Sequence, residues 1–169
     1  MKKVLIAVDE TESSKSVLSV FHNMVRPPET VVLVHVQRIE GKSMMIDMLG
    51  EAEMETLRES LKGSAHKEAL DRQSQKILNY YKKALDNGGL VNVKTVVRDG
   101  VPSEEILKVA QEEGVDLIIT GFSGKTVMQR LVSGCVSRDL EKNAPVPVLV
   151  AKDMEEKHAW GVAPIGAKI

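Results

Sequence analysis

The chain has 169 residues, of which 43% are hydrophobic and 28% charged, a composition typical of one soluble globular domain and not of a disordered segment. The 23 Lys and Arg residues nearly balance the 24 Asp and Glu residues, so the net charge is −1 and no basic excess is available to bind nucleic acid. The single cysteine, Cys135, excludes an intramolecular disulfide framework and a multi-cysteine zinc site. No apolar run is long enough for a signal-peptide core or a membrane span, so the sequence predicts a cytoplasmic protein that does not bind membranes.

Five short apolar runs recur along the chain, with amphipathic stretches between them. Four of the runs are almost continuously apolar, which is typical of strands buried on both faces of a parallel sheet. The third run alternates more, through Asn92 and Lys94. The predicted strands cover residues 4–8, 31–36, 91–97, 117–120 and 146–151.

The stretches between the runs have helical spacing. Val17, Phe21 and Met24 belong to one apolar stripe, and a second stripe runs from Leu70 to Leu85. A third helix is expected to begin at Pro102, with Glu104 and Glu105 in its first turn, and to end at Gly114. The alternation of strands and helices predicts an α/β fold, a doubly wound, five-stranded parallel sheet with helices on both faces.

The predicted domain covers residues 1–151, and two regions exceed what this fold needs. The stretch of about 41–64 holds four of the eight methionines, and it is either an ordinary amphipathic helix or a mobile lid or partner surface. The charged and then small-residue segment 152–169 forms a C-terminal tail, either disordered or docked through Trp160.

Ligands of open α/β sheets bind beyond the carboxyl ends of the strands, where the strand order reverses. Asp9 follows the first strand and could accept a hydrogen bond from such a ligand; the alternative is that Asp9 and the residues after it only cap the next helix. The other histidine, cysteine and carboxylate positions form no recognisable catalytic or metal-ligating pattern.

Glycines cluster after the fourth strand. Gly121, Gly124 and Gly134 allow backbone N–H groups to approach an anion, and a helix that starts near Gly134 directs its positive end towards it. The alternative is a plain turn followed by a helix boundary. Gly124-Lys125-Thr126 is not the end of a Walker A loop, because Ile119 occupies the position of the required first glycine.

The spacing Gly121-x2-Gly124-x9-Gly134 resembles the nucleotide-binding signature of the universal stress protein family, Gly-x2-Gly-x9-Gly-Ser/Thr. Other segments resemble the family in the same order, from Ile6-Ala7-Val8-Asp9 and Leu33-Val34-His35-Val36 to the closing residues 144–150. The resemblance implies a Rossmann-like fold of the adenine nucleotide alpha hydrolase-like type.

The resemblance also implies an adenine-nucleotide site, with ATP as the first candidate and Mg²⁺ as a potential companion. Asp9 would contact the adenosine part, the backbone at Val36 would meet the adenine, and the glycines would hold ribose and phosphates. The implied binding residues are Ala7, Asp9, Val36, Thr120, Gly121, Gly124, Gly134, Cys135, Val136 and Ser137. Members of the family usually form homodimers through their last strands, here residues 146–150, an apolar run that would need cover as a sheet edge.

Cys135 departs from the family pattern, in which Ser or Thr follows the last glycine. A thiol is a weak hydrogen-bond donor, so the change would cost about 1 kcal/mol, or under about tenfold in affinity. Cys135 is either an inert small residue or a reactive thiol at a helix N-terminus that senses oxidants.

The sequence therefore predicts a stress-response module regulated by an adenine nucleotide, with no catalytic residue assigned and at most a slow ATPase activity. Two alternatives stay open. Cys135 favours an interaction module of the same fold that binds no nucleotide, and the wider fold group includes ATP-hydrolysing and phosphoryl-transferring enzymes.

Overall fold

The computed structural model describes residues 1–37, 50–61, 63, 65–86, 89, 91–122 and 135–152. Its centre is a five-stranded parallel sheet in the order β3-β2-β1-β4-β5. The strands are β1 (Lys3–Ala7), β2 (Thr30–Gln37), β3 (Asn92–Asp99), β4 (Leu117–Gly121) and β5 (Val148–Ala151). The predicted doubly wound α/β fold is therefore confirmed, and each strand lies within a few residues of its predicted bounds.

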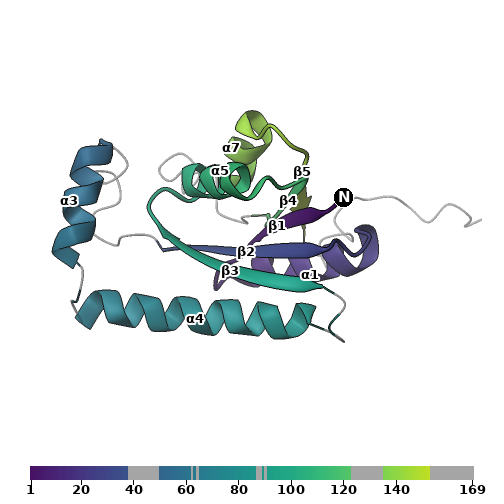
Figure 1. Ribbon diagram of the computed structural model, residues 1–169, viewed down its shortest axis with the longest axis horizontal. Coiled ribbons are helices and arrows are strands. Elements are labelled where there is room, and N and C mark those ends of the chain that lie inside the picture. Colours follow the sequence, from purple (N-terminus) through teal and green to yellow (C-terminus); the bar gives the residue numbers. More distant parts are fainter. Residues whose placement is uncertain are drawn as a thin grey trace, which may run out of the picture.

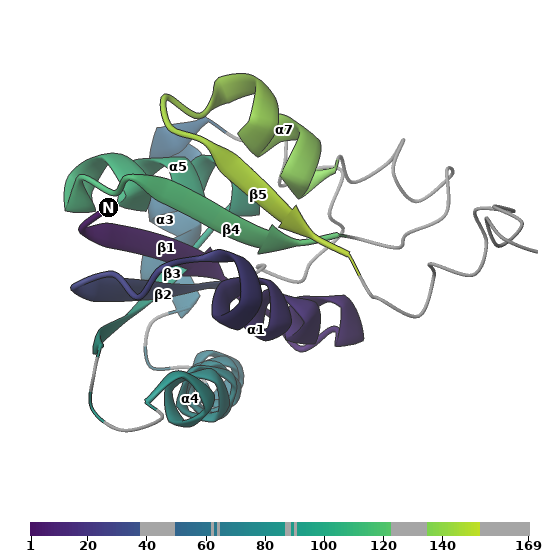
Figure 2. The same ribbon diagram turned by 90° about the vertical axis from the view of Figure 1, so that its right-hand side faces the viewer.

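Helices cover both faces of the sheet (Figures 1 and 2). On one face lie α1 (Glu12–Met24) and α4 (Ala65–Leu85), and on the other α5 (Pro102–Glu113) and α7 (Val136–Asn143). Successive residues of β1 point to opposite faces, so Val4 and Ile6 pack with α1 and α4, whereas Leu5 packs with α5. All three side chains are completely buried, which explains why the strands appear as continuous apolar runs.

The boundaries of α5 follow from its sequence. Pro102 occupies the first turn, where its missing N–H costs nothing, and Glu104 and Glu105 complement the positive end of the helix dipole. Gly114 closes the helix in the left-handed conformation with φ of 60°, and its N–H donates to the carbonyls of Ala110 and Gln111. This helix matches the prediction.

The two edges of the sheet differ in character. Along β3, Lys94 pairs with Glu113 and Arg98 pairs with Glu112, both carboxylates coming from α5. Along β5, Val148, Leu149 and Val150 are half-buried. The first edge therefore presents ion pairs and the second presents aliphatic side chains.

Within the methionine-rich stretch, α3 (Glu51–Leu61) is the part that the structure describes, together with Gly50 and Gly63. It stands beyond the carboxyl ends of the strands, on the side where α4 begins (Figure 1). Residues 38–49 and the tail from residue 153 lie outside the described residues, so the lid and docking hypotheses stay predictions. None of the helices in the described ranges is both long and apolar enough to cross a membrane.

Candidate functional site

A cavity of about 540 Å³ opens at the carboxyl ends of β1, β2 and β4. From β1 the chain continues to β2 on one side of the sheet, whereas β4, the other neighbour of β1, leads to β5 on the opposite side. The cavity therefore lies at the point where the strand order reverses, the usual ligand position in open α/β sheets. Its volume is in the range of roughly 300–1,000 Å³ that is typical of small-molecule pockets.

The floor of the cavity is fixed by main-chain contacts between β1 and β2. The N–H of Val8 donates to the carbonyl of Val34 at 2.9 Å. The buried imidazole of His35 lies 2.9 Å from the carbonyl of Val8 through Nδ1. Because a carbonyl only accepts, Nδ1 carries the proton in this contact. His35 is therefore packed at the end of β2, and its ring holds the chain leaving β1 in place.

Asp9 lies at the rim, in a turn that is fixed by its own carboxylate. Its Oδ1 accepts from the backbone N–H of Thr11 at 2.8 Å and from the Thr11 hydroxyl at 2.5 Å, and its N–H donates to the hydroxyl of Ser14 at 3.0 Å. Oδ2 accepts no hydrogen bond from any described residue. One oxygen therefore orders the loop, and the other is free to accept a hydrogen bond from a ligand.

The opposite side of the cavity comes from β4 and α7. Thr120 is the register partner of Ala7, and both lie in the cavity wall with Gly121. Val136, the first residue of α7, completes this side. Cys135 caps α7, and its Sγ lies 3.2 Å from the hydroxyl of the buried Ser137, so these two side chains pack against each other near the cavity and not in its wall.

The first half of α4 forms a wall that the sequence analysis did not assign. His66, Ala69, Leu70 and Gln73 follow helical spacing and all face the cavity. The amide of Gln73 also donates to the carboxylate of Glu10 at 3.0 Å, which links α4 to the loop after β1. Helical periodicity revealed the apolar stripe of α4 but could not show which polar positions meet the strand ends.

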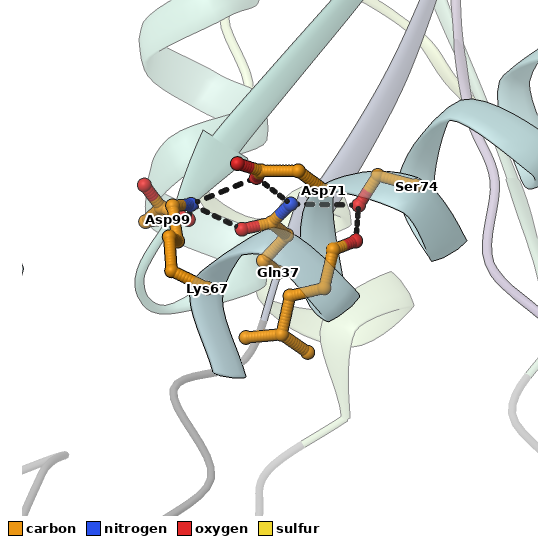
Figure 3. A network of polar contacts seen from close by, with 6 residues as sticks. Gln37, Lys67, Asp71, Ser74 and Asp99 are labelled. Atoms are coloured by element: carbon orange, nitrogen blue, oxygen red, sulfur yellow. Dashed lines mark hydrogen bonds and ion pairs between the residues drawn. The ribbon is translucent and has the colours of Figure 1, made fainter. Parts of the chain in front are cut away.

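A polar network joins this wall to the ends of β2 and β3 (Figure 3). The amide nitrogen of Gln37 donates to Asp71 at 2.9 Å and to Ser74 at 2.8 Å, and its oxygen accepts from the ammonium of Lys67 at 2.5 Å. Lys67 also pairs with Asp99 at 2.7 Å and with Asp71 at 3.2 Å. Three segments distant in sequence thus meet through polar groups that range from the buried Gln37 and Ser74 to the exposed Asp71.

The network shifts the titration of two of its members. Burial opposes the charged form of Lys67, but the hydrogen bonds to Asp99 and Asp71 outweigh it and raise the pKa of the ammonium above 10.5. The hydrogen bond from Gln37, aided by that from Lys67, lowers the pKa of the Asp71 carboxyl below 3.8. Both groups therefore stay ionised throughout the neutral range.

The structure brings six of the ten predicted binding residues together in the cavity wall: Ala7, Asp9, Val36, Thr120, Gly121 and Val136. Cys135 and Ser137 lie beside the wall, at the start of α7. Gly124 and Gly134 fall outside the described residues. The predicted arrangement of the glycine loop is therefore not described, whereas the strand-end residues converge.

The charged residues of the cavity wall, as far as the described residues form it, are the carboxylates of Asp9 and Glu10, and no Lys or Arg lines it. Within the same residues, no group of three or more His, Cys, Asp or Glu side chains could hold a metal ion. The apolar walls and two rim carboxylates suit an uncharged, hydroxyl-bearing group better than a phosphate.

Comparison with known proteins identifies relatives along nearly the whole chain. The model of the universal stress protein family matches residues 1–152. Universal stress protein MJ0577 of Methanocaldococcus jannaschii is 32% identical over 157 residues, which cover 89% of this chain and 94% of the relative. A solved structure of MJ0577 aligns with a TM-score of 0.60 at 30% identity, over 90% of this chain and 96% of that one.

A more distant structure, a universal stress protein family protein from Arabidopsis thaliana with AMP bound, aligns with a TM-score of 0.59 at 18% identity. It covers 92% of this chain and 95% of its own, and at this identity it shows the shared fold alone. With a family model that spans the complete sheet and a relative matched along almost its entire length, the chain belongs to the universal stress protein family.

Proposed function

We propose that the chain binds an adenine nucleotide, ATP first, in the cavity at the carboxyl ends of β1, β2 and β4. The observation that carries the proposal is the convergence of Ala7, Asp9, Val36 and Thr120 on one cavity at the reversal of strand order. Two proteins of the same fold support it, one described with AMP bound and another in complex with cAMP.

The chemistry of the cavity wall suggests how the nucleotide is oriented. The free Oδ2 of Asp9 can accept from a ribose hydroxyl, and the half-buried Val36 at the end of β2 offers main-chain groups and an aliphatic surface to the base. The carboxylates of Asp9 and Glu10 disfavour phosphates beside them. We therefore assign the nucleoside to the described cavity and the phosphates to the glycine-bearing segment of Gly121, Gly124 and Gly134, followed by Cys135, Val136 and Ser137 at the start of α7.

The output that fits such a site is regulatory: nucleotide occupancy changes the interactions of a cytoplasmic protein. Mg²⁺ would accompany a bound triphosphate and neutralise part of its charge. Homodimerisation through β5 belongs to the same proposal, because that edge of the sheet presents aliphatic side chains. No residue is assigned a catalytic role.

Isothermal titration calorimetry with ATP tests the proposal, together with analysis of nucleotide released from the denatured protein. We expect saturable binding, weakened about tenfold or more by Asp9→Asn. Asparagine keeps an oxygen for Thr11 but replaces the free Oδ2 by an amide NH₂, which cannot accept from a hydroxyl. Asp86→Asn, at the exposed end of α4, is the matched control and should leave the affinity unchanged.

Two outcomes would replace the proposal. No binding at millimolar ATP would favour the interaction module without nucleotide, the alternative suggested by Cys135. ATP turnover above a very slow background, abolished by substitution of Gly124, would indicate an enzyme.

A further inference from the structure

The first half of α4 is held to the sheet differently from its second half. Its contribution to the apolar core comes from Ile77, Leu78, Tyr81 and Leu85, all in the second half. The part of the cavity wall that α4 supplies comes from His66, Ala69, Leu70, Gln73 and Ser74, all in the first half, and none of these belongs to either apolar core cluster of the described residues. The part of α4 that shapes the cavity thus depends on polar contacts for its position.

Gln37 is the centre of those contacts (Figure 3). Its side chain is only 3% exposed, and both hydrogens of its amide are donated, one to Asp71 and one to Ser74 of α4. Its oxygen accepts from Lys67, which reaches on to Asp99 at the end of β3. Because both N–H groups and the oxygen of the buried amide are bonded to side chains of α4, the amide favours one orientation of this helix.

Gln37 also follows Val36 directly in β2. The two residues are held in register with Arg98 and Asp99 of β3, and the carbonyl of Gln37 accepts from the N–H of Gly100 at 3.1 Å. Gln37, which contacts α4, and Val36, whose main chain is proposed to meet the base, are therefore neighbours in the same hydrogen-bonded end of β2.

We propose that Gln37, with Lys67 as its charged partner, is a positioning residue that sets the α4 wall of the cavity against the base-binding end of β2. The inference rests on the proposed nucleotide function and adds to it a determinant of base selectivity. Gln37 lines the cavity next to Val36, but its amide nitrogen and oxygen are bonded to Asp71, Ser74 and Lys67 of α4, so we assign it to positioning this helix and not to a polar contact with the base. A wall that is set by three hydrogen bonds accepts one size and shape of base, and a loosened wall discriminates less well.

The test compares Gln37→Leu and Lys67→Met with Lys94→Met, which removes an ion pair of the β3 edge away from the cavity. Titration calorimetry gives the affinities for ATP, GTP and adenosine. Amide hydrogen exchange of the protein without nucleotide measures how often the first half of α4 detaches from the sheet. In both network variants we expect affinities for ATP and adenosine to fall about tenfold and the preference for ATP over GTP to shrink. Exchange should accelerate at residues 66–74 and stay unchanged at residues 78–85.

The controls separate positioning from general stability. Lys67→Arg keeps the charge and the donors and should restore most of the affinity and the base preference. Lys94→Met should leave both unchanged. If Gln37→Leu does not fold, Lys67→Met carries the same comparison, since it leaves the buried amide in place.

The contrary results are distinct. If the network variants bind ATP and GTP as the parent does, the positioning role is wrong and the nucleotide function stands. If Gln37→Leu, Lys67→Met and Lys94→Met all lose affinity, and amide hydrogens throughout the protein lose protection against exchange to the same degree, the network only stabilises the fold. This result would also overturn the inference. If the parent protein binds no nucleotide, the proposed function fails and the inference fails with it.

Discussion

At the scale of single residues, Gly114 occupies a position where the main-chain conformation, and not the surrounding space, favours glycine. Its φ of 60° lies in the left-handed region, and a Cβ built there would meet no other atom within 4 Å. Any cost of a side chain therefore comes from the conformation of the main chain and not from crowding. The glycine directly follows the last residue of α5, and β4 begins at Leu117.

We expect Gly114→Ala to lower the free energy of unfolding by about 1 kcal/mol, because alanine disfavours the left-handed conformation. Urea denaturation measures the change. Gly114→Asn should lose less, since asparagine tolerates this region better. An alanine variant as stable as the parent would show that the end of α5 relaxes at no cost.

The residue scale also marks the limit of sequence reasoning about the site. Asp9 could be placed at a strand end and considered either as a ligand contact or as part of the cap of the next helix. In the structure Thr11 is the N-cap of α1, and Asp9 orders the turn before it through Oδ1, while its Oδ2 stays available for a ligand. The roles of Gln37 and Lys67 could not be predicted. They depend on contacts between residues 30 and 32 positions apart, which no local pattern encodes.

At the scale of elements, Asp116 joins the starts of two neighbouring strands. Its Oδ2 accepts from the N–H of Lys3 at 3.0 Å and from that of Lys2 at 2.6 Å, just before β1 and β4 run side by side. These backbone hydrogen bonds lower the pKa of the Asp116 carboxyl below 3.8. The folded state therefore favours the ionised carboxylate more than the unfolded chain does.

The sign of the pH effect follows from this shift. With a lower pKa in the folded state, the stabilisation by Asp116 is complete above the unfolded pKa of about 3.9 and is lost as the pH falls through the folded value. Asp116→Asn, which keeps an acceptor without the charge, should make the fall in unfolding free energy below about pH 4 shallower. Urea denaturation at several pH values measures it, with Asp86→Asn as the control, and an unchanged slope would contradict the expectation.

Most of the strands and helices could be predicted from the sequence, but the signal that identified a strand differed from the signal that identified a helix. Continuous apolar runs identified the buried strands, and Pro102 with Gly114 bounded α5, because these signals are local. The start of α4 at Ala65 was missed, since its first turns carry polar residues whose partners lie on β2 and β3. The predicted domain limits, 1–151 with a tail from 152, stay a prediction.

At the scale of the whole molecule, the fold has one edge suited to a second copy. Backbone groups of a parallel strand alternate in direction, and the carbonyls of Pro147 and Ala151 accept from β4. The N–H and carbonyl of Val148 and Val150 are therefore expected to face outward along β5, beside half-buried aliphatic side chains.

We expect the protein to sediment as a dimer and Val150→Asp to shift it towards the monomer. A charged side chain at this position would enter the aliphatic contact between two β5 strands, where an unpaired carboxylate is unfavourable. Sedimentation velocity gives the mass, and circular dichroism verifies that the variant is folded. Thr95→Asp, on the exposed side of β3, is the matched control and should leave the mass unchanged; a monomeric parent protein would refute the dimer.

The ion pairs of β3 have a consequence for how far assembly can proceed. A pair of chains that meet through β5 has covered both aliphatic edges, and the edges left at its two ends each carry Lys94 and Arg98 paired with Glu113 and Glu112. Charged side chains at an edge strand oppose further strand addition. The continuous sheet of ten strands would thus have two closed ends, so self-association terminates at a discrete particle and does not grow into a fibre.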